Sequence, residues 1–133
     1  MSENTAQESA AAHNGDEAAA LARALMDAAR AGDLETLRPA IEAEIPLNMQ
    51  DADGNTMLML AAYHGHAPLV EFLAAQGAKV DLLNDRGQSP LAGAVFKGFD
   101  DVVEALVEAG ADPDAGKPSA RESVQFFGRS YVF

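Results

Sequence analysis

One pattern of residues recurs after 33 positions in the middle of the chain, and it constrains the fold more than any other feature. The identical pairs are Gly54/Gly87, Leu58/Leu91, Ala61/Ala94, Gly65/Gly98, Val70/Val103, Glu71/Glu104, Leu73/Leu106, Gly77/Gly110, Ala78/Ala111 and Asp81/Asp114. A fixed period of this length is typical of repeat proteins, in which each unit is one supersecondary module. Such a module cannot bury its apolar face alone and has to stack on its neighbours.

Each copy of the pattern begins as a turn and continues as two short helices. A glycine suits the turn, and Thr56 or Ser89 then suits the N-cap, where its side-chain oxygen accepts from the first helical turn. Pro90 suits the first helical position because its missing N–H needs no partner there. Glycines follow each helix, and the second helices are predicted over 68–76 and 100–109. The positions with a constant inward phase, which we expect to be buried, are Leu58, Ala61, Leu73, Leu91, Ala94 and Leu106.

The repeated segment resembles the ankyrin-repeat family. Residues 58–73 are similar to the core PLHLAAxxGHxxVVxxLL, and residues 77–81 are similar to the ending GAxVN. The resemblance covers about residues 21–128 and is strongest to small stand-alone bacterial-type ankyrin proteins. It implies an all-α solenoid of stacked helix-turn-helix units with short β-turn or hairpin connections. The family's TPLH histidine is replaced by Met59 and Ala92, which implies that one network between repeats is weakened while the fold is kept.

The period also predicts how the chain is divided. The segments are a disordered acidic leader (1–15), a degenerate N-terminal capping repeat (16–50), two ankyrin repeats (51–83 and 84–116), and a C-terminal capping helix with its tail (117–133). Ser119 and Glu122 form a capping-box pattern at the start of the last helix. Pro39 falls inside the second helix of the capping repeat, where we expect it to kink or shorten that helix.

Composition excludes several classes of function. The net charge is −12, which disfavours nonspecific binding to nucleic acid. The absence of cysteine excludes disulfides and thiolate zinc sites. No apolar run is long enough to cross a membrane, and the N-terminus lacks the pattern of a secretory signal. We therefore expect a cytoplasmic protein, monomeric, with no nucleic-acid or membrane partner.

No constellation of residues predicts catalysis. His64 and His66 form a His-Gly-His pair without a third ligand at supporting spacing, so metal binding is the minor alternative and a local capping role for His66 is the main one. Ser89, Ser119, Ser123 and Ser130 suit caps or the tail and have no histidine partner fixed by pattern. We expect the protein to have no enzymatic activity and no resident cofactor.

The ankyrin resemblance implies a partner-binding surface along the turns and the exposed end of each first helix. The residues that it assigns there are Asp53, Asn55, Met59, Tyr63, His64, Asp85, Arg86, Gln88, Phe96 and Lys97, with Ala52 beside them. Tyr63 and Phe96 hold equivalent positions one repeat apart, and exposed neighbouring aromatics mark interfaces. The alternative is that both rings pack against neighbouring helices at the edge of the core.

Two functions remain open from the sequence. The first is a small cytoplasmic adaptor or regulator that binds a protein partner through the concave face. The alternative, by resemblance to ankyrin proteins that accompany catalase, is an oxidative-stress accessory protein that assists haem supply, with Tyr63, His64 or Met59 touching haem. If the concave face is not the site, the next candidate is the basic C-terminal end, which contains Lys117, Arg121, Arg129, Tyr131 and Phe133.

Overall fold

The protein is a stack of short helix pairs. The computed structural model describes residues 2–127 and 131–133, with side chains described at 16–125 and 131–133. The described residues form seven helices and no strand, and their one β-type pairing is an isolated bridge between Gln50 and Thr56. The helices are α1 (Ser2–Ala31), α2 (Leu34–Glu42), α3 (Met57–Tyr63), α4 (Ala67–Ala75), α5 (Pro90–Lys97), α6 (Asp100–Glu108) and α7 (Ala120–Phe127). The predicted all-α repeat solenoid is confirmed.

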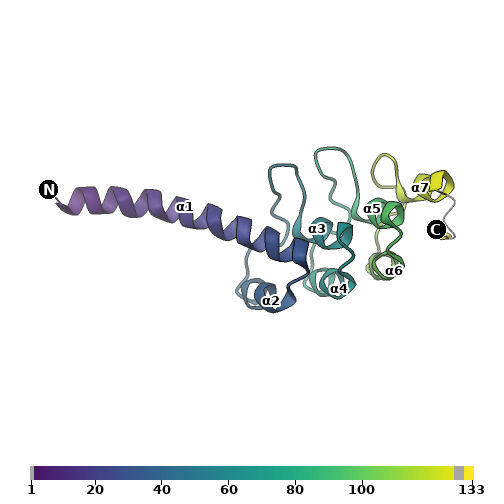
Figure 1. Ribbon diagram of the computed structural model, residues 1–133, viewed down its shortest axis with the longest axis horizontal. Coiled ribbons are helices and arrows are strands. Elements are labelled where there is room, and N and C mark those ends of the chain that lie inside the picture. Colours follow the sequence, from purple (N-terminus) through teal and green to yellow (C-terminus); the bar gives the residue numbers. More distant parts are fainter. Residues whose placement is uncertain (1, 128–130) are drawn as a thin grey trace.

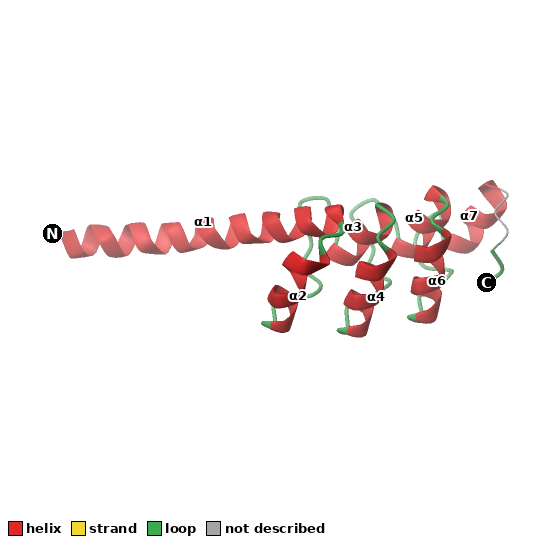
Figure 2. Cartoon of the chain, turned by 60° about the horizontal axis from the view of Figure 1, so that its bottom comes forward, coloured by secondary structure: helices red, strands yellow, loops and turns green. Residues whose placement is uncertain are grey.

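The helices lie in two rows (Figure 1). An inner row runs from the C-terminal part of α1 through α3 and α5 to α7, and each member contacts the next. An outer row consists of α2, α4 and α6, each packed on the inner helix that precedes it. The turns between repeats project away from the outer row, beyond the inner helices (Figure 1). The N-terminal part of α1 extends past the end of the stack, as Figure 2 shows from another side.

The predicted caps are present at the starts of the inner helices. The hydroxyl of Thr56 accepts from the N–H of Met59 at 3.1 Å, and the hydroxyl of Ser89 accepts from that of Ala92 at 3.1 Å. Pro90 is the first residue of α5, as expected. Gly98 closes α5 in the left-handed conformation, with a φ of 76° that a residue with a Cβ adopts only at a cost.

The core follows the predicted phase. All six positions expected to be buried are at most 1% exposed: Leu58, Ala61, Leu73, Leu91, Ala94 and Leu106. Small alanines between the leucines let the helices of adjacent repeats approach closely, so the stack needs few aromatic residues in its core.

Two local predictions for the N-terminal third differ from the structure. Helix α1 begins at Ser2, where a disordered leader was expected, because the segment contains four alanines and no proline interrupts it. Helix α2 is not shortened by Pro39: it has nine residues, as do α4 and α6. Pro39 and Glu35, whose carbonyl loses its donor, are both exposed, and water can replace the missing hydrogen bond there.

The C-terminal cap is a helix held from both sides. Ser119 and Glu122 form the predicted capping box, since the hydroxyl of Ser119 accepts from the Glu122 N–H at 3.2 Å and the Glu122 carboxylate accepts from the Ser119 N–H at 3.1 Å. Arg121 pairs with Asp114 at 2.8 Å and donates to the carbonyl of Phe133 at 2.8 Å. The hydroxyl of Tyr131 donates to the carboxylate of Asp100. The tail is thereby tied to α6 and α7.

Side chains at the ends of repeats tie one repeat to the next in place of the missing TPLH histidine. The carbonyl oxygen of the Asn48 side chain accepts from the N–H of Lys79 at 2.8 Å. One repeat later, the carboxylate of Asp81 accepts from the N–H of Asp112 at 2.9 Å. Burial raises the pKa of Asp81, and the bond from Asp112 lowers it in part. Within the described part of the chain, no helix is long and apolar enough to span a membrane.

Candidate functional site

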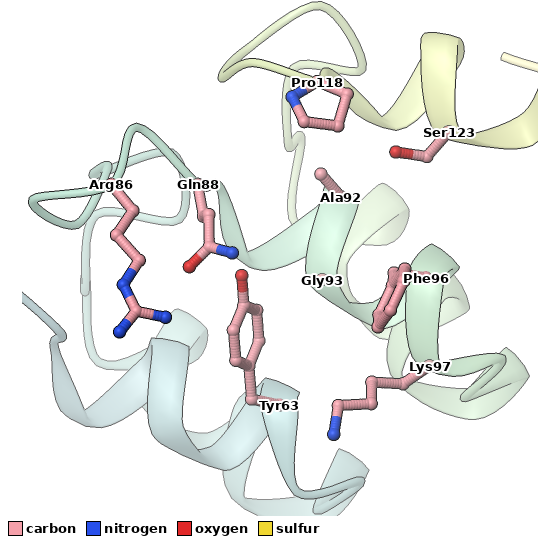
Figure 3. A pocket seen from close by; sticks show the side chains of 9 residues that line it. All are labelled: Tyr63, Arg86, Gln88, Ala92, Gly93, Phe96, Lys97, Pro118 and Ser123. Atoms are coloured by element: carbon pink, nitrogen blue, oxygen red, sulfur yellow. The ribbon is translucent and has the colours of Figure 1, made fainter. Parts of the chain in front are cut away.

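A hollow of about 430 Å³ opens between the turns and the inner row, at the junction of the second and third repeats and the C-terminal cap (Figure 3). We call it the hollow throughout. The residues that line it are Tyr63, Arg86, Gln88, Ala92, Gly93, Phe96, Lys97, Pro118 and Ser123. Its volume lies within the range of ligand pockets, which run from about 300 to 1,000 Å³. Five of the residues predicted from the sequence meet here, and they come from two helices and one turn.

Tyr63 lies across the helix of the next repeat and not free in solvent. A Cβ added at Gly93 would stand 1.6 Å from Cε1 of Tyr63, so the ring occupies the space that a side chain at position 93 would fill. Burial raises the pKa of the Tyr63 hydroxyl above its ordinary value of 10.0, and the Arg86 cation lowers it in part. Both aromatic rings were expected to be exposed interface residues. Tyr63 departs from this expectation, because it is partly buried and its ring packs between repeats.

Phe96 differs from its equivalent Tyr63, because 53% of it is exposed. It projects from the far side of Gly93, with Lys97 beside it (Figure 3). Arg86 descends from the turn on the other side of Tyr63, so the two cations approach the same ring from opposite sides (Figure 3). The hollow thus combines an exposed ring with two positive charges.

The turn above the hollow is held by Asn84, which sequence reasoning did not single out. Its side-chain oxygen accepts from the N–H groups of Arg86 and Gln88, both at 3.0 Å. Its amide nitrogen donates to the side-chain oxygens of Asn55 at 2.9 Å and Gln88 at 2.8 Å. Asn84 is only 9% exposed, and it joins two successive turns as one unit. Arg86 and Gln88 are therefore positioned over the hollow by backbone contacts.

Several predicted site residues lie elsewhere. Met59 is fully buried, which corrects its assignment to the binding surface. The side-chain oxygen of Asn55 accepts a hydrogen bond from the side-chain amide of Asn84. Asp53 and Asp85 are exposed on successive turns outside the hollow, and the Asp85 N–H donates to the Asp53 carbonyl at 3.0 Å. His64 is exposed at the end of α3 and also does not line the hollow.

The two histidines of the His-Gly-His pair have structural contacts. Nδ1 of His64 lies 2.8 Å from the Leu60 carbonyl oxygen in its own helix. Nε2 of His66 lies 2.9 Å from the Arg30 carbonyl oxygen in the preceding repeat. His66 is the N-cap residue of α4, but its side chain bridges repeats and makes no capping hydrogen bond to its own helix. Its ring fills the space beside Gly32, where a Cβ would stand 2.4 Å from Nδ1. Among the side chains that the structure describes, no three His, Cys, Asp or Glu residues gather as a metal site.

The serines and the basic C-terminal end are also engaged in the fold. Ser89 and Ser119 are caps, and the hydroxyl of Ser123 donates to the Ser119 carbonyl at 2.8 Å. Ser130 and Arg129 lie outside the described residues. Because Arg121 is paired with Asp114, the described part of the basic end offers less free charge than the sequence predicts.

Sequence reasoning missed Gly93, Ala92, Pro118 and Ser123 as parts of the site. A signal for Gly93 was present: it stands where the preceding repeat has Leu60, and glycine is unfavourable inside a helix. The other three become neighbours only when the capping helix docks on α5, which no local pattern reveals.

Comparison with known proteins places the chain in a family. A family model described as ankyrin repeats (3 copies) matches residues 25–117. Among curated relatives, serine/threonine-protein kinase 12 of Arabidopsis thaliana is 37% identical over 87 residues, which are 65% of this chain and 19% of the relative. Ankyrin repeat domain-containing protein SAT10 of Stachybotrys chartarum is 34% identical over 95 residues, 71% of this chain and 5% of the relative. Ankyrin repeat family A protein 2 of Mus musculus is 41% identical over 70 residues, 53% of this chain and 22% of the relative.

These matches identify the repeat family and do not indicate a more specific function. The chain spans less than a quarter of each of these relatives, and the kinase match lies in its repeat region. The bacterial-type origin expected from the sequence is not distinguished by them and stays a prediction. Ankyrin repeats are generally non-catalytic modules of protein–protein interaction. Since the family match covers most of the chain and the helix pairs have the expected form, the chain belongs to the ankyrin-repeat family.

Proposed function

We propose that this chain is a non-catalytic adaptor or regulator that binds a protein partner through the hollow, in the cytoplasm. The observation that carries the proposal is the hollow itself, where a half-exposed Phe96 adjoins two cations. Aromatic and arginine side chains contribute most to binding energy at protein interfaces. The turns that hold the rim are fixed by Asn84, so little ordering is needed on binding.

Site-specific photocrosslinking tests this function. The photoreactive residue p-benzoylphenylalanine replaces Phe96 in one variant and Val107 in a matched control. Val107 is 47% exposed but lies on α6 in the outer row. After irradiation in a lysate of the source organism, we expect position 96 to capture a defined protein, and position 107 to give no such adduct. Equal capture at both positions, or none at 96, would contradict the assignment.

A binding measurement with the captured partner completes the test. Phe96→Ala should weaken binding by at least about 2 kcal/mol, or about thirtyfold, as expected for a central aromatic anchor. Val107→Ala should leave affinity unchanged. The single change is preferred to one that includes Tyr63, because the Tyr63 ring also packs on Gly93 and its loss affects stability.

The alternative role in haem supply finds less support in the geometry. Met59 is buried and cannot reach a haem at the surface, and Nδ1 of His64 is bonded within its own helix. Titration with hemin distinguishes the two functions. A shifted Soret band that is lost in His64→Ala would favour the haem role.

A further inference from the structure

The charges that line the hollow are opposite to those of the rest of the molecule. The chain has 21 Asp and Glu residues against 9 Lys and Arg residues, yet the described residues that line the hollow include two cations and no carboxylate. Arg86 and Lys97 are both exposed. Among the side chains that the structure describes, neither cation has an ion pair. Positive charge is therefore in local excess at the hollow.

Three other cations of the chain have side-chain contacts within the fold. Arg30 pairs with Asp27 at 2.7 Å, and Arg121 pairs with Asp114. The guanidinium of Arg38 lies over the Phe72 ring, 4.9 Å from its centroid. Within the described residues, Arg86 and Lys97 form no such ion pair or ring contact, so their charges remain available to a ligand.

The chemistry of the hollow is particular to one junction of the stack. A second hollow of about 390 Å³ lies between α1 and the preceding turn, but carboxylates line it together with cations: Asp27, Asp51 and Asp53 with Arg23 and Arg30. At the junction before that of the hollow, Arg30 and Leu60 take the positions of Tyr63 and Gly93. A leucine there leaves no notch in the helix for a ring from the preceding repeat. The combination of ring, notch and cations is therefore not a general property of the repeat, and it points to a ligand of matching chemistry.

We propose that the hollow takes a short acidic segment of a partner protein. An aliphatic or aromatic side chain of that segment packs on Phe96 between Ala92 and Pro118, and neighbouring carboxylates meet Arg86 and Lys97 on the two sides of the Tyr63 ring (Figure 3). Carboxylates pair with arginine through charge-assisted hydrogen bonds. This inference rests on the proposed function, because it names the chemistry of the partner at the same site.

The net charge of −12 limits how far the anionic ligand extends. At physiological salt the Debye length is about 8 Å, so distant carboxylates of the chain are screened while groups in contact are not. A few acidic residues confined to the hollow meet mainly Arg86 and Lys97. A long polyanion such as a nucleic acid would continue over an acidic surface and be repelled.

Selection from a random peptide library displayed on phage, with the full chain as bait, tests the inference. We expect the selected peptides to share an acidic residue next to a large apolar one. When the acidic residues of a selected peptide are replaced by their amides, binding should weaken at least tenfold. The charge-reversed variant Arg86→Glu/Lys97→Glu should lose these peptides and select basic ones in their place.

A matched control separates the local effect from total charge. Arg23→Glu/Lys79→Glu makes the same change in net charge outside the hollow, and it should keep the acidic peptides at full affinity. Circular dichroism confirms that each variant is folded. Selected peptides without acidic residues, equal losses in both charge variants, or no selected peptides would overturn the inference.

The outcome for Phe96→Ala distinguishes this inference from the function on which it rests. If selected peptides are neutral or basic but lose binding on Phe96→Ala, the acidic ligand is wrong and the hollow remains the binding site. If acidic peptides are selected but bind the Phe96→Ala variant with unchanged affinity, the hollow is not where they bind, and both proposals fail.

Discussion

The absence of a side chain at position 93 is what lets two repeats share the Tyr63 ring. Glycine inside a helix is less favourable than alanine by about 1 kcal/mol, so Gly93 needs a compensating contact. That contact is the Tyr63 ring, which lies where a Cβ would be. The pair also sets the depth of the hollow, because a larger residue at either position would fill it.

A double-mutant cycle on this pair should show strong coupling. In the Tyr63→Ala background, Gly93→Ala should stabilise the protein by about 1 kcal/mol, since only helix propensity changes. In the wild-type background the same change displaces the ring and should be less favourable by at least about 1 kcal/mol. Urea unfolding of the four proteins measures the difference. Equal effects in both backgrounds would mean that the two residues do not touch.

At the scale of the elements, the helices of the two full repeats were predictable and the hollow was only partly so. Thr56, Ser89 and the glycines mark helix ends through local backbone chemistry, which the sequence carries directly. Met59 was assigned to the surface, and this was wrong because α3 has α1, α5 and α4 around it, so that residues 57–62 are all buried. Burial on a helix with neighbours on several sides depends on packing between repeats, which a single period does not specify.

The capping helix is held by an ion pair whose contribution we expect to depend on pH. The hydrogen bond and charge of Arg121 hold the pKa of Asp114 below its ordinary value of 3.8. Because the folded pKa is lower than the unfolded one, the pair contributes stability above about pH 3.8 and loses it as the pH falls through the lowered value. The bond should therefore stabilise the docked cap at neutral pH and not in strong acid.

The variant Asp114→Asn tests this dependence. It should be less stable than the wild type at neutral pH, and the difference should vanish below the ordinary aspartate range. Urea unfolding across the pH series gives the comparison. In the Arg121→Gln background, the same substitution should show almost no dependence on pH. A difference that persists in acid would mean that the charge of Asp114 has no part in holding the cap.

At the scale of the whole molecule, stability depends on bonds between neighbouring units, because each repeat touches only the next. Asn84 joins successive turns, Asn48 and Asp81 join successive repeat ends, and His66 joins α4 to the end of α1. These bonds span about one repeat in sequence. The missing TPLH histidine is thus one of several possible ties, and its loss leaves the stack connected.

Asn84→Asp tests one such tie. The change keeps the shape and the acceptor, but it removes both amide donors and turns an oxygen toward the oxygens of Asn55 and Gln88. We expect a loss of about 1–3 kcal/mol in the free energy of unfolding, as for buried acceptors left unpaired. Asp51 is the equivalent residue one repeat earlier and acts as an acceptor for the N–H groups of its own turn. Asp51→Asn should therefore change stability by less than about 0.5 kcal/mol, and equal losses would contradict the bridging role.

The walls of the hollow come from different units: Tyr63 from one repeat, Arg86 to Lys97 from the next, and Pro118 and Ser123 from the cap. No single repeat unit therefore contains all the residues that form the hollow. Duplication of one repeat would lengthen the array without adding a second hollow, because neither repeat carries both the tyrosine and the glycine and only the last repeat meets the cap. Recombination among units could therefore relocate or erase the binding surface in one step.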